Sequence, residues 1–172
     1  MTVKQIADEF NLWQQIEAAV NGILVAESAA PALLERIARI PIHKSRSTRR
    51  LGVYVSKGSE PICIRLQFAQ EQANLKQTFL HEVAHACDHL TRSKKPSTYQ
   101  RVHGSSWKEW ARVLGISTQS CGESEAVSLL HQQRVKLIAV CLKCGVEFYR
   151  VRRLNRNRIY IHQNCGGKIK SV

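Results

Sequence analysis

The sequence predicts an α+β fold with a short β-rich unit at its C-terminus. Apolar residues recur at helical spacing over residues 72–91, the longest helical pattern in the chain. Before this helix, residues 51–55 and 62–67 have the pattern of two strands around a turn. From Val140 onward, helical spacing gives way to cysteines, alternating apolar residues and arginines. These three observations indicate helices packed on a small sheet, followed by a separate β unit.

The first fifty residues predict two helices and a basic connection. Residues 3–20 should form one amphipathic helix, whose apolar side carries Val3, Ile6, Phe10, Trp13, Ile16 and Val20. A shorter helix is expected after Pro31 and is stopped by Pro41. Residues 43–50 then carry four positive charges and no acidic residue.

The second half of the chain predicts two further helices beyond the long one. Residues 107–114 should be helical, and Gly115 should close that helix as a C-terminal cap. Residues 123–139 are also expected to be helical. The change of character near Val140 leads us to expect two domains, residues 1–135 and residues 136–172.

The charge of the chain is strongly positive. Its 172 residues include 26 Lys and Arg against 13 Asp and Glu, a net charge of +13. This surplus favours polyanionic partners, with nucleic acid as the first candidate. The first ten residues carry acids and lack the apolar core of a secretory signal, and the nearest apolar run, residues 22–26, is far too short to span a membrane. We therefore expect a cytoplasmic protein with no membrane association, bound to the nucleoid if it is bacterial.

A metal-binding pattern lies on the long helix. Residues 79–85 contain the motif H-E-x-x-H, in which His81 and His85 are four residues apart and so lie one above the other on one face. Both imidazoles can then reach one Zn²⁺, and Glu82 can take a proton from water at the open coordination position. The opposite face of the helix is apolar and consists of Phe79, Val83, Cys87 and Leu90.

A catalytic zinc needs a third protein ligand, and three residues compete for this role. His89 lies one turn further along the same helix, which carries it away from the metal. Glu109 would give a thermolysin-like site, but it also completes a capping box with Ser106, which explains its position. His103 lies just before that cap, and Gly104 gives the backbone freedom to turn its imidazole inward. We favour His103.

Two segments together resemble the SprT-like family, which includes the Spartan proteases. They are residues 78–90, with H-E-x-x-H-A, and residues 103–110, with H-G-x-x-W; the similarity covers roughly residues 45–165. The resemblance implies a zincin-like metalloprotease domain, in which the H-E-x-x-H helix packs on a small antiparallel sheet. It also implies protein substrates crosslinked to DNA or tightly bound on it. The implied site consists of the zinc ligands His81, His85 and His103 and the catalytic base Glu82.

Three of the six cysteines lie close together near the C-terminus, which points to a metal site in a reducing compartment. The pattern C-x₂-C-x₁₇-H-x₂-C matches a zinc ribbon with a filled, structural zinc site. Its ligands are Cys141, Cys144, His162 and Cys165. Several SprT-like proteins similarly end in a zinc ribbon, more commonly with four cysteines. The other three cysteines, Cys63, Cys87 and Cys121, are expected to be small buried hydrophobic residues.

The predicted ribbon contains a hairpin and a dense positive charge. Residues 146–152 and 158–161 should be its strands, turning at residues 155–157. Residues 141–172 carry eight basic residues and one acidic residue, a balance of +7, whereas residues 1–40 have a balance of −2. We expect DNA, single-stranded or at a junction, to contact Arg150, Arg152, Arg153, Arg156 and Arg158. Tyr149 and Tyr160 could stack on unpaired bases, although packing within the hairpin is the favoured role.

Together these patterns predict a zinc-dependent endopeptidase that acts on proteins bound or crosslinked to DNA, with one catalytic and one structural zinc. One alternative is a non-catalytic DNA-binding or transcription-associated zinc protein that uses the first metal for structure. Glu82 separates these alternatives, because a structural site needs no carboxylate there. A second alternative is a thermolysin-like peptidase with Glu109 as a zinc ligand and no role in nucleic-acid binding.

Overall fold

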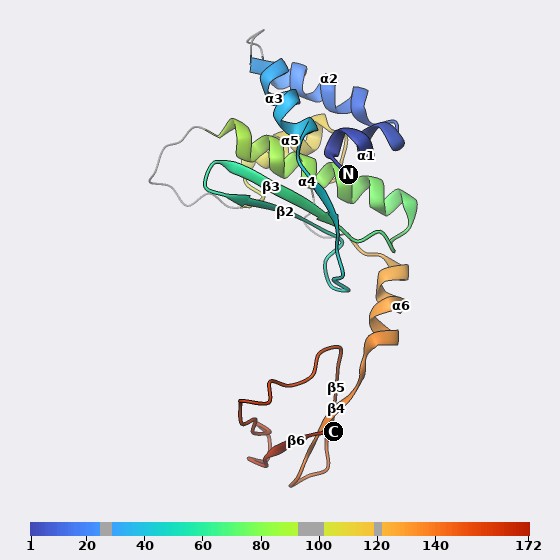
Figure 1. Cartoon of the computed structure of the whole chain (residues 1–172), viewed down its shortest axis with the longest axis vertical. Coiled ribbons are helices and arrows are strands. Elements are labelled where there is room, and N and C mark those ends of the chain that lie inside the picture. The colour runs from blue at the N-terminus through green and yellow to red at the C-terminus, as the bar shows by residue number, and fades with distance from the viewer. Residues whose placement is uncertain (25–28, 93–101, 119–121) are drawn as a thin grey trace. The chain divides into compact units, whose positions relative to one another are not determined.

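The computed structural model describes residues 1–24, 29–92, 102–118 and 122–172, and its fold is a mixed α+β fold with two small sheets (Figure 1). Internal contacts divide the chain into two compact units, Met1–Glu125 and Ala126–Val172, which are described separately below. The expected domain boundary after residue 135 stays a prediction. Within the described ranges, no helix has the length and apolar character needed to cross a membrane.

The N-terminal segment forms two helices, α1 (Val3–Glu9) and α2 (Trp13–Ile23), so the single helix expected over residues 3–20 was wrong. The helical conformation is interrupted at Asn11, whose φ of 58° lies in the left-handed region that asparagine tolerates. The apolar spacing continues across this break, so periodicity alone could not reveal it. The next helix, α3 (Ala29–Ala38), already includes Pro31 in its first turn, where a missing N–H costs no helical hydrogen bond.

The first sheet has the strand order β1-β3-β2 and lies in the first unit (Figure 1). Strands β2 (Gly52–Lys57) and β3 (Glu60–Leu66) form the expected antiparallel pair. Strand β1 (Ile42–Lys44) pairs with β3 in parallel, so the expectation of a purely antiparallel sheet was wrong. This strand has three residues, of which only Ile42 is buried, and so it has no alternation that sequence reasoning could detect.

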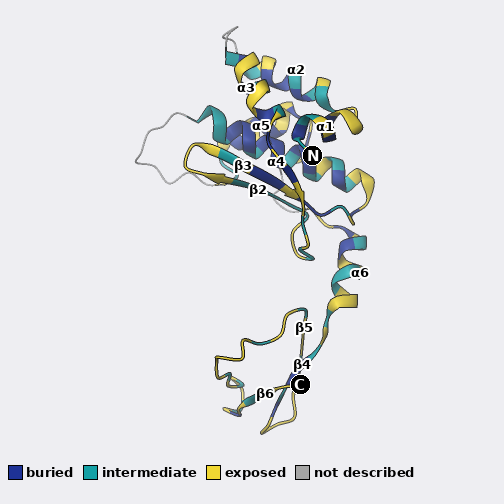
Figure 2. Ribbon diagram, in the orientation of Figure 1, coloured by how far each residue is buried: buried dark blue, intermediate teal, exposed yellow. Residues whose placement is uncertain are grey.

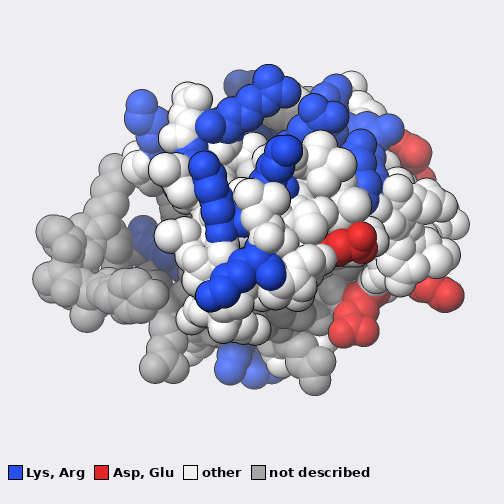
Figure 3. Space-filling view, turned by 90° about the horizontal axis from the view of Figure 1, so that it is seen from below, with Lys and Arg blue, Asp and Glu red and all other residues white. Residues whose placement is uncertain are grey.

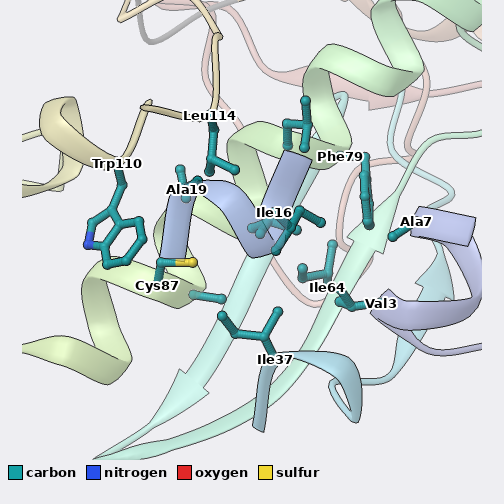
Figure 4. Packing of buried hydrophobic residues seen from close by; sticks show 14 of the residues in the cluster. Val3, Ala7, Ile16, Ala19, Ile37, Ile64, Phe79, Cys87, Trp110 and Leu114 are labelled. Atoms are coloured by element: carbon teal, nitrogen blue, oxygen red, sulfur yellow. The ribbon is translucent and has the colours of Figure 1, made fainter. Parts of the chain in front are cut away.

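Helix α4 (Gln72–Thr91) spans the residues expected for it and contacts both β2 and β3. Its apolar face is buried as predicted, since Phe79, Val83 and Cys87 are fully buried. Side chains from α2, α3 and β3 meet this face in the core, among them Ile16, Ile37 and Ile64 (Figure 4). Burial of the helix along most of its length fixes the position of the residues on its other face (Figure 2).

Helix α5 (Ser105–Val113) begins two residues earlier than expected. Its N-cap is Gly104 and no side chain caps it, so the expected capping box of Ser106 and Glu109 was wrong. Gly115 ends the helix as predicted, with a φ of 66° and an N–H donated to the carbonyl of Arg112 at 3.0 Å. Trp107 and Trp110 belong to this helix, and both side chains are buried.

The second unit contains most of α6 (Glu125–Arg134) and a sheet of order β5-β4-β6. The helix expected over residues 123–139 was wrong beyond Arg134, because β4 (Lys136–Cys141) is the central strand of this sheet. Strands β5 (Glu147–Arg150) and β6 (Ile169–Ser171) pair with it on either side, both antiparallel. The expected strand over residues 158–161 is reduced to a single bridge between Ile161 and Lys168. The hairpin expected between residues 146–152 and 158–161 was therefore wrong, because β5 pairs with β4 instead.

Candidate metal centres and the basic surface

Three histidines of the first unit converge on one point. His81 and His85 project from adjacent turns of α4, and His103 comes from the segment just before α5. Their Nε2 atoms form a nearly equilateral triangle, with separations of 3.2 Å (His81–His85), 3.1 Å (His85–His103) and 3.2 Å (His81–His103). The structure therefore brings together the three residues that the sequence selected.

The triangle suits a tetrahedral zinc ion. Zinc–nitrogen bonds of about 2.0–2.1 Å place ligand nitrogens about 3.3–3.4 Å apart, close to the observed spacing. Burial lowers the pKa of His81 to about 4 and that of His85 to about 3, so both imidazoles are neutral near pH 7. A neutral imidazole has the free lone pair that a metal requires. Three protein ligands also leave one coordination position open.

The Trp107 ring packs against all three imidazoles. Its ring lies 4.8 Å from that of His81, 5.2 Å from that of His85 and 4.4 Å from that of His103, measured between ring centroids. Trp107 is fully buried, so packing on all sides restricts its ring. The sequence placed Trp107 in a motif but gave it no role; the structure places its ring against all three histidine rings.

Glu82 points toward strand β2 and is 6% exposed. Burial raises the pKa of its carboxyl to about 7, and a hydrogen bond from the backbone N–H of Tyr54 opposes this rise. Gly52 makes the close approach possible, because a Cβ at that position would lie 2.7 Å from Glu82 Oε1. Sequence reasoning missed this role of Gly52; a glycine within a strand pattern is the signal that could have revealed it.

The two rejected ligand candidates lie elsewhere. His89 accepts a hydrogen bond from the Tyr54 hydroxyl through Nδ1 at 2.8 Å and donates one from Nε2 to the Gly58 carbonyl at 2.9 Å. His89 therefore links the β2–β3 turn to α4 by a hydrogen bond. Glu109 is exposed on α5 and is no member of the three-histidine group.

We expect His103→Ala to lose the zinc of the three-histidine group and all cleavage that depends on it. Glu109→Gln should retain the zinc and change the free energy of unfolding by no more than about 0.5 kcal/mol, because Glu109 is exposed and makes no cap. Zinc content per chain and thermal unfolding of both variants test this. Zinc lost in Glu109→Gln and kept in His103→Ala would reverse the ligand assignment.

A second group of metal-ligating residues lies in the second unit. The ligand atoms of Cys141, Cys144, His162 and Cys165 all lie within 4.8 Å of one another. Sγ of Cys165 is 3.5 Å from Sγ of Cys141 and 3.4 Å from that of Cys144, far beyond a disulfide bond. His162 Nδ1 lies 3.1 Å and 3.2 Å from the thiols of Cys144 and Cys165. Four donors around one point are compatible with a closed tetrahedral zinc site.

The two ligand pairs have the same backbone structure. Gly145 donates its N–H to the Cys141 carbonyl at 3.0 Å, and Gly166 donates its N–H to the His162 carbonyl at 2.8 Å. Both glycines have positive φ, 72° and 68°, as these tight turns require. The backbone N–H of Cys144 lowers the pKa of the Cys141 thiol to about 6, which favours the thiolate that a metal binds.

Basic side chains dominate the surface of the second unit. The five arginines named from the sequence are all exposed: Arg150, Arg152, Arg153, Arg156 and Arg158. Many Lys and Arg side chains, and few Asp and Glu side chains, appear on the face drawn in Figure 3. Tyr149 is 57% exposed, with its hydroxyl donated to Glu147, so the packing role favoured for it was wrong. Tyr160 is half-buried and accepts a hydrogen bond from the Asn155 N–H.

Two of the three remaining cysteines, Cys63 and Cys87, are buried as expected, and Cys121 lies outside the described residues. Comparison with protein families gives a match to the SprT-like family over residues 25–126, more than half of the chain. The matched region contains all three histidines and Glu82. Neither the curated proteins nor the solved structures yielded a significant match.

Proposed function

Because the chain belongs to the SprT-like family, we propose that it is a zinc-dependent endopeptidase that cleaves proteins bound or crosslinked to DNA. The family is generally of the metallopeptidase type. The observation that carries the proposal is the triangle of three histidine Nε2 atoms, together with buried Glu82, which follows His81 on the same helix. A structural zinc site would need a fourth protein ligand, and none of the described residues joins the three histidines.

The chain's residues have distinct roles in the proposed reaction. His81, His85 and His103 would hold zinc, and Trp107 would keep their rings in place. When bound, zinc would lower the pKa of a water molecule and polarise the scissile carbonyl. Glu82 would take the proton of that water and later give it to the leaving amine. This arrangement supports the inference that the first unit is zincin-like.

The second unit would supply the DNA contact. Its four-ligand group would hold a structural zinc, and its exposed arginines would contact the phosphates of single-stranded or junction DNA. The exposed ring of Tyr149 supports a contact with unpaired bases. Binding of DNA would concentrate the enzyme beside proteins attached to it. We also propose a cytoplasmic protein, associated with the nucleoid if it is bacterial.

Single-stranded DNA should accelerate cleavage of a DNA-binding protein such as a histone. The variant Arg150→Gln/Arg152→Gln/Arg153→Gln should lose most of this acceleration, because each lost phosphate contact weakens DNA binding. Each lost contact should also flatten the dependence of log affinity on log salt by about 0.7. Cleavage rates with and without DNA, at two salt concentrations, measure both effects. Equal acceleration of the wild type and the variant would remove DNA anchoring by this surface from the proposal.

A further inference from the structure

The connection between β1 and β2 in the first unit carries a second group of basic residues, in addition to those of the second unit. We call residues 44–50, which are the last residue of β1 and the segment after it, the basic loop (Figure 1). Four of its seven residues are basic and exposed, and none is acidic: Lys44, Arg46, Arg49 and Arg50. Nothing in the proposed reaction uses this loop.

Hydrogen bonds with the last residue of β3 and with Gln67 after it hold the backbone of the basic loop. At its start, Ser45 donates its N–H to the Leu66 carbonyl at 2.7 Å. In its middle, the side chain of Gln67, which is 3% exposed, donates to the Ser47 carbonyl at 2.6 Å. At its end, the N–H of Gln67 is donated to the Leu51 carbonyl at 2.8 Å. Such a loop loses little conformational entropy when a ligand binds.

A side chain of the basic loop holds the backbone of two of its arginines. The hydroxyl of Ser47 accepts hydrogen bonds from the N–H groups of Arg49 at 3.1 Å and Arg50 at 3.0 Å. The backbone of these two residues is therefore fixed, while their side chains extend to solvent. This arrangement presents two consecutive exposed arginines, and a guanidinium group suits the planar, bidentate recognition of phosphate oxygens.

The basic loop ends close to Gly52, the residue that faces the Glu82 carboxyl. Arg50 precedes Gly52 by two residues, a distance of at most about 7 Å along the backbone. Gly52 is the residue whose absent Cβ makes room for Glu82 Oε1. Buried Gln70 strengthens this connection: it donates to the Leu51 carbonyl at 3.3 Å and accepts a hydrogen bond from Thr78, one turn before Glu82, at 2.9 Å.

From this geometry we infer that the basic loop binds the phosphate backbone of a nucleic acid and places it beside Glu82. The inference rests on the proposed function for its consequence: DNA held at the loop would bring an attached protein directly to the zinc site. DNA is favoured over an acidic peptide because three of the four basic residues are arginines and the second unit is also strongly basic. Each unit would then contribute its own phosphate contacts.

The test compares two full-length variants that lose the same charge. The loop variant is Lys44→Gln/Arg49→Gln/Arg50→Gln. The control is Lys57→Gln/Lys108→Gln/Arg112→Gln, three exposed residues of the same unit outside the loop. Fluorescence anisotropy with a labelled single-stranded oligonucleotide is measured over a range of salt concentrations, and thermal unfolding confirms that both variants fold. The loop variant should bind at least about tenfold more weakly, with the magnitude of its salt slope lowered by about 2, corresponding to three lost contacts.

Equal weakening of both variants would overturn the inference, since net charge alone would then explain the loss. Unchanged affinity of the loop variant would overturn it as well. Competition by polyglutamate as strong as that by an oligonucleotide of equal charge would identify an acidic-peptide site instead. Binding is measured without cleavage, so the result stands apart from peptidase activity: an inactive chain can still show the loop effect, and an active peptidase can lack it.

Discussion

Replacing Glu82 with glutamine should lower the rate of peptide hydrolysis by about 10²–10⁴-fold, the usual contribution of a general base. The amide keeps the size of the side chain but cannot accept a proton from water. The three histidines are unchanged, so zinc content should remain that of the wild type. Hydrolysis of a fluorogenic peptide, together with zinc content per chain, measures both quantities.

Glu109→Gln is the matched control, because it makes the same chemical change at an exposed site in the same unit. It should retain both the hydrolysis rate and the zinc. An active Glu82→Gln variant would show that Glu82 is not the base. A variant that loses zinc with its activity would show that the carboxylate holds the site together and would leave its catalytic role unsupported.

Removing two ligands of the second metal group should unfold the ribbon while leaving the three-histidine site intact. Structural zinc in such small units supplies about 10–16 kcal/mol of apparent binding free energy, most of which is folding free energy. The second unit has few buried hydrophobic residues of its own, among them Val127, Ile138 and Ala139. Cys141→Ser/Cys144→Ser should therefore bind one zinc instead of two and lose the dispersed NMR signals of residues 136–172.

Cys63→Ala serves as the control, because Cys63 is buried in the first unit and belongs to neither metal group. This variant should retain two zinc ions. Loss of both ions from the Cys141/Cys144 variant, or a single ion in the wild type, would contradict the account of two independent sites.

The sequence was most informative where function depends on local spacing. The separation of His81 and His85 by one helical turn required only that residues 72–91 form a helix, and α4 has those bounds. His103 could be selected because it lies just before the next helix and Gly104 gives the backbone freedom to turn its imidazole inward. The ribbon ligands followed from two short pairs, each of which forms a local turn around a glycine.

Other features depend on tertiary contacts that no local pattern records. The break at Asn11 leaves the apolar spacing intact, and the parallel strand β1 exists only because β3 lies beside it. Helix α5 begins after Gly104 without the side-chain hydrogen bond that signals a cap. The close approach of Gly52 to Glu82 joins residues thirty positions apart, so a strand pattern could suggest but not establish it.

Zinc removal and restoration tests the central claim most directly. The wild-type chain is stripped with a chelator, reloaded with zinc, and incubated with histone and single-stranded DNA, and the products are identified by mass spectrometry. We predict internal cleavage of the histone by the loaded enzyme, none by the stripped enzyme, and recovery when zinc is returned. If zinc binds His81, His85 and His103 and no peptide bond is cleaved, the chain is a non-catalytic zinc protein and the account is contradicted.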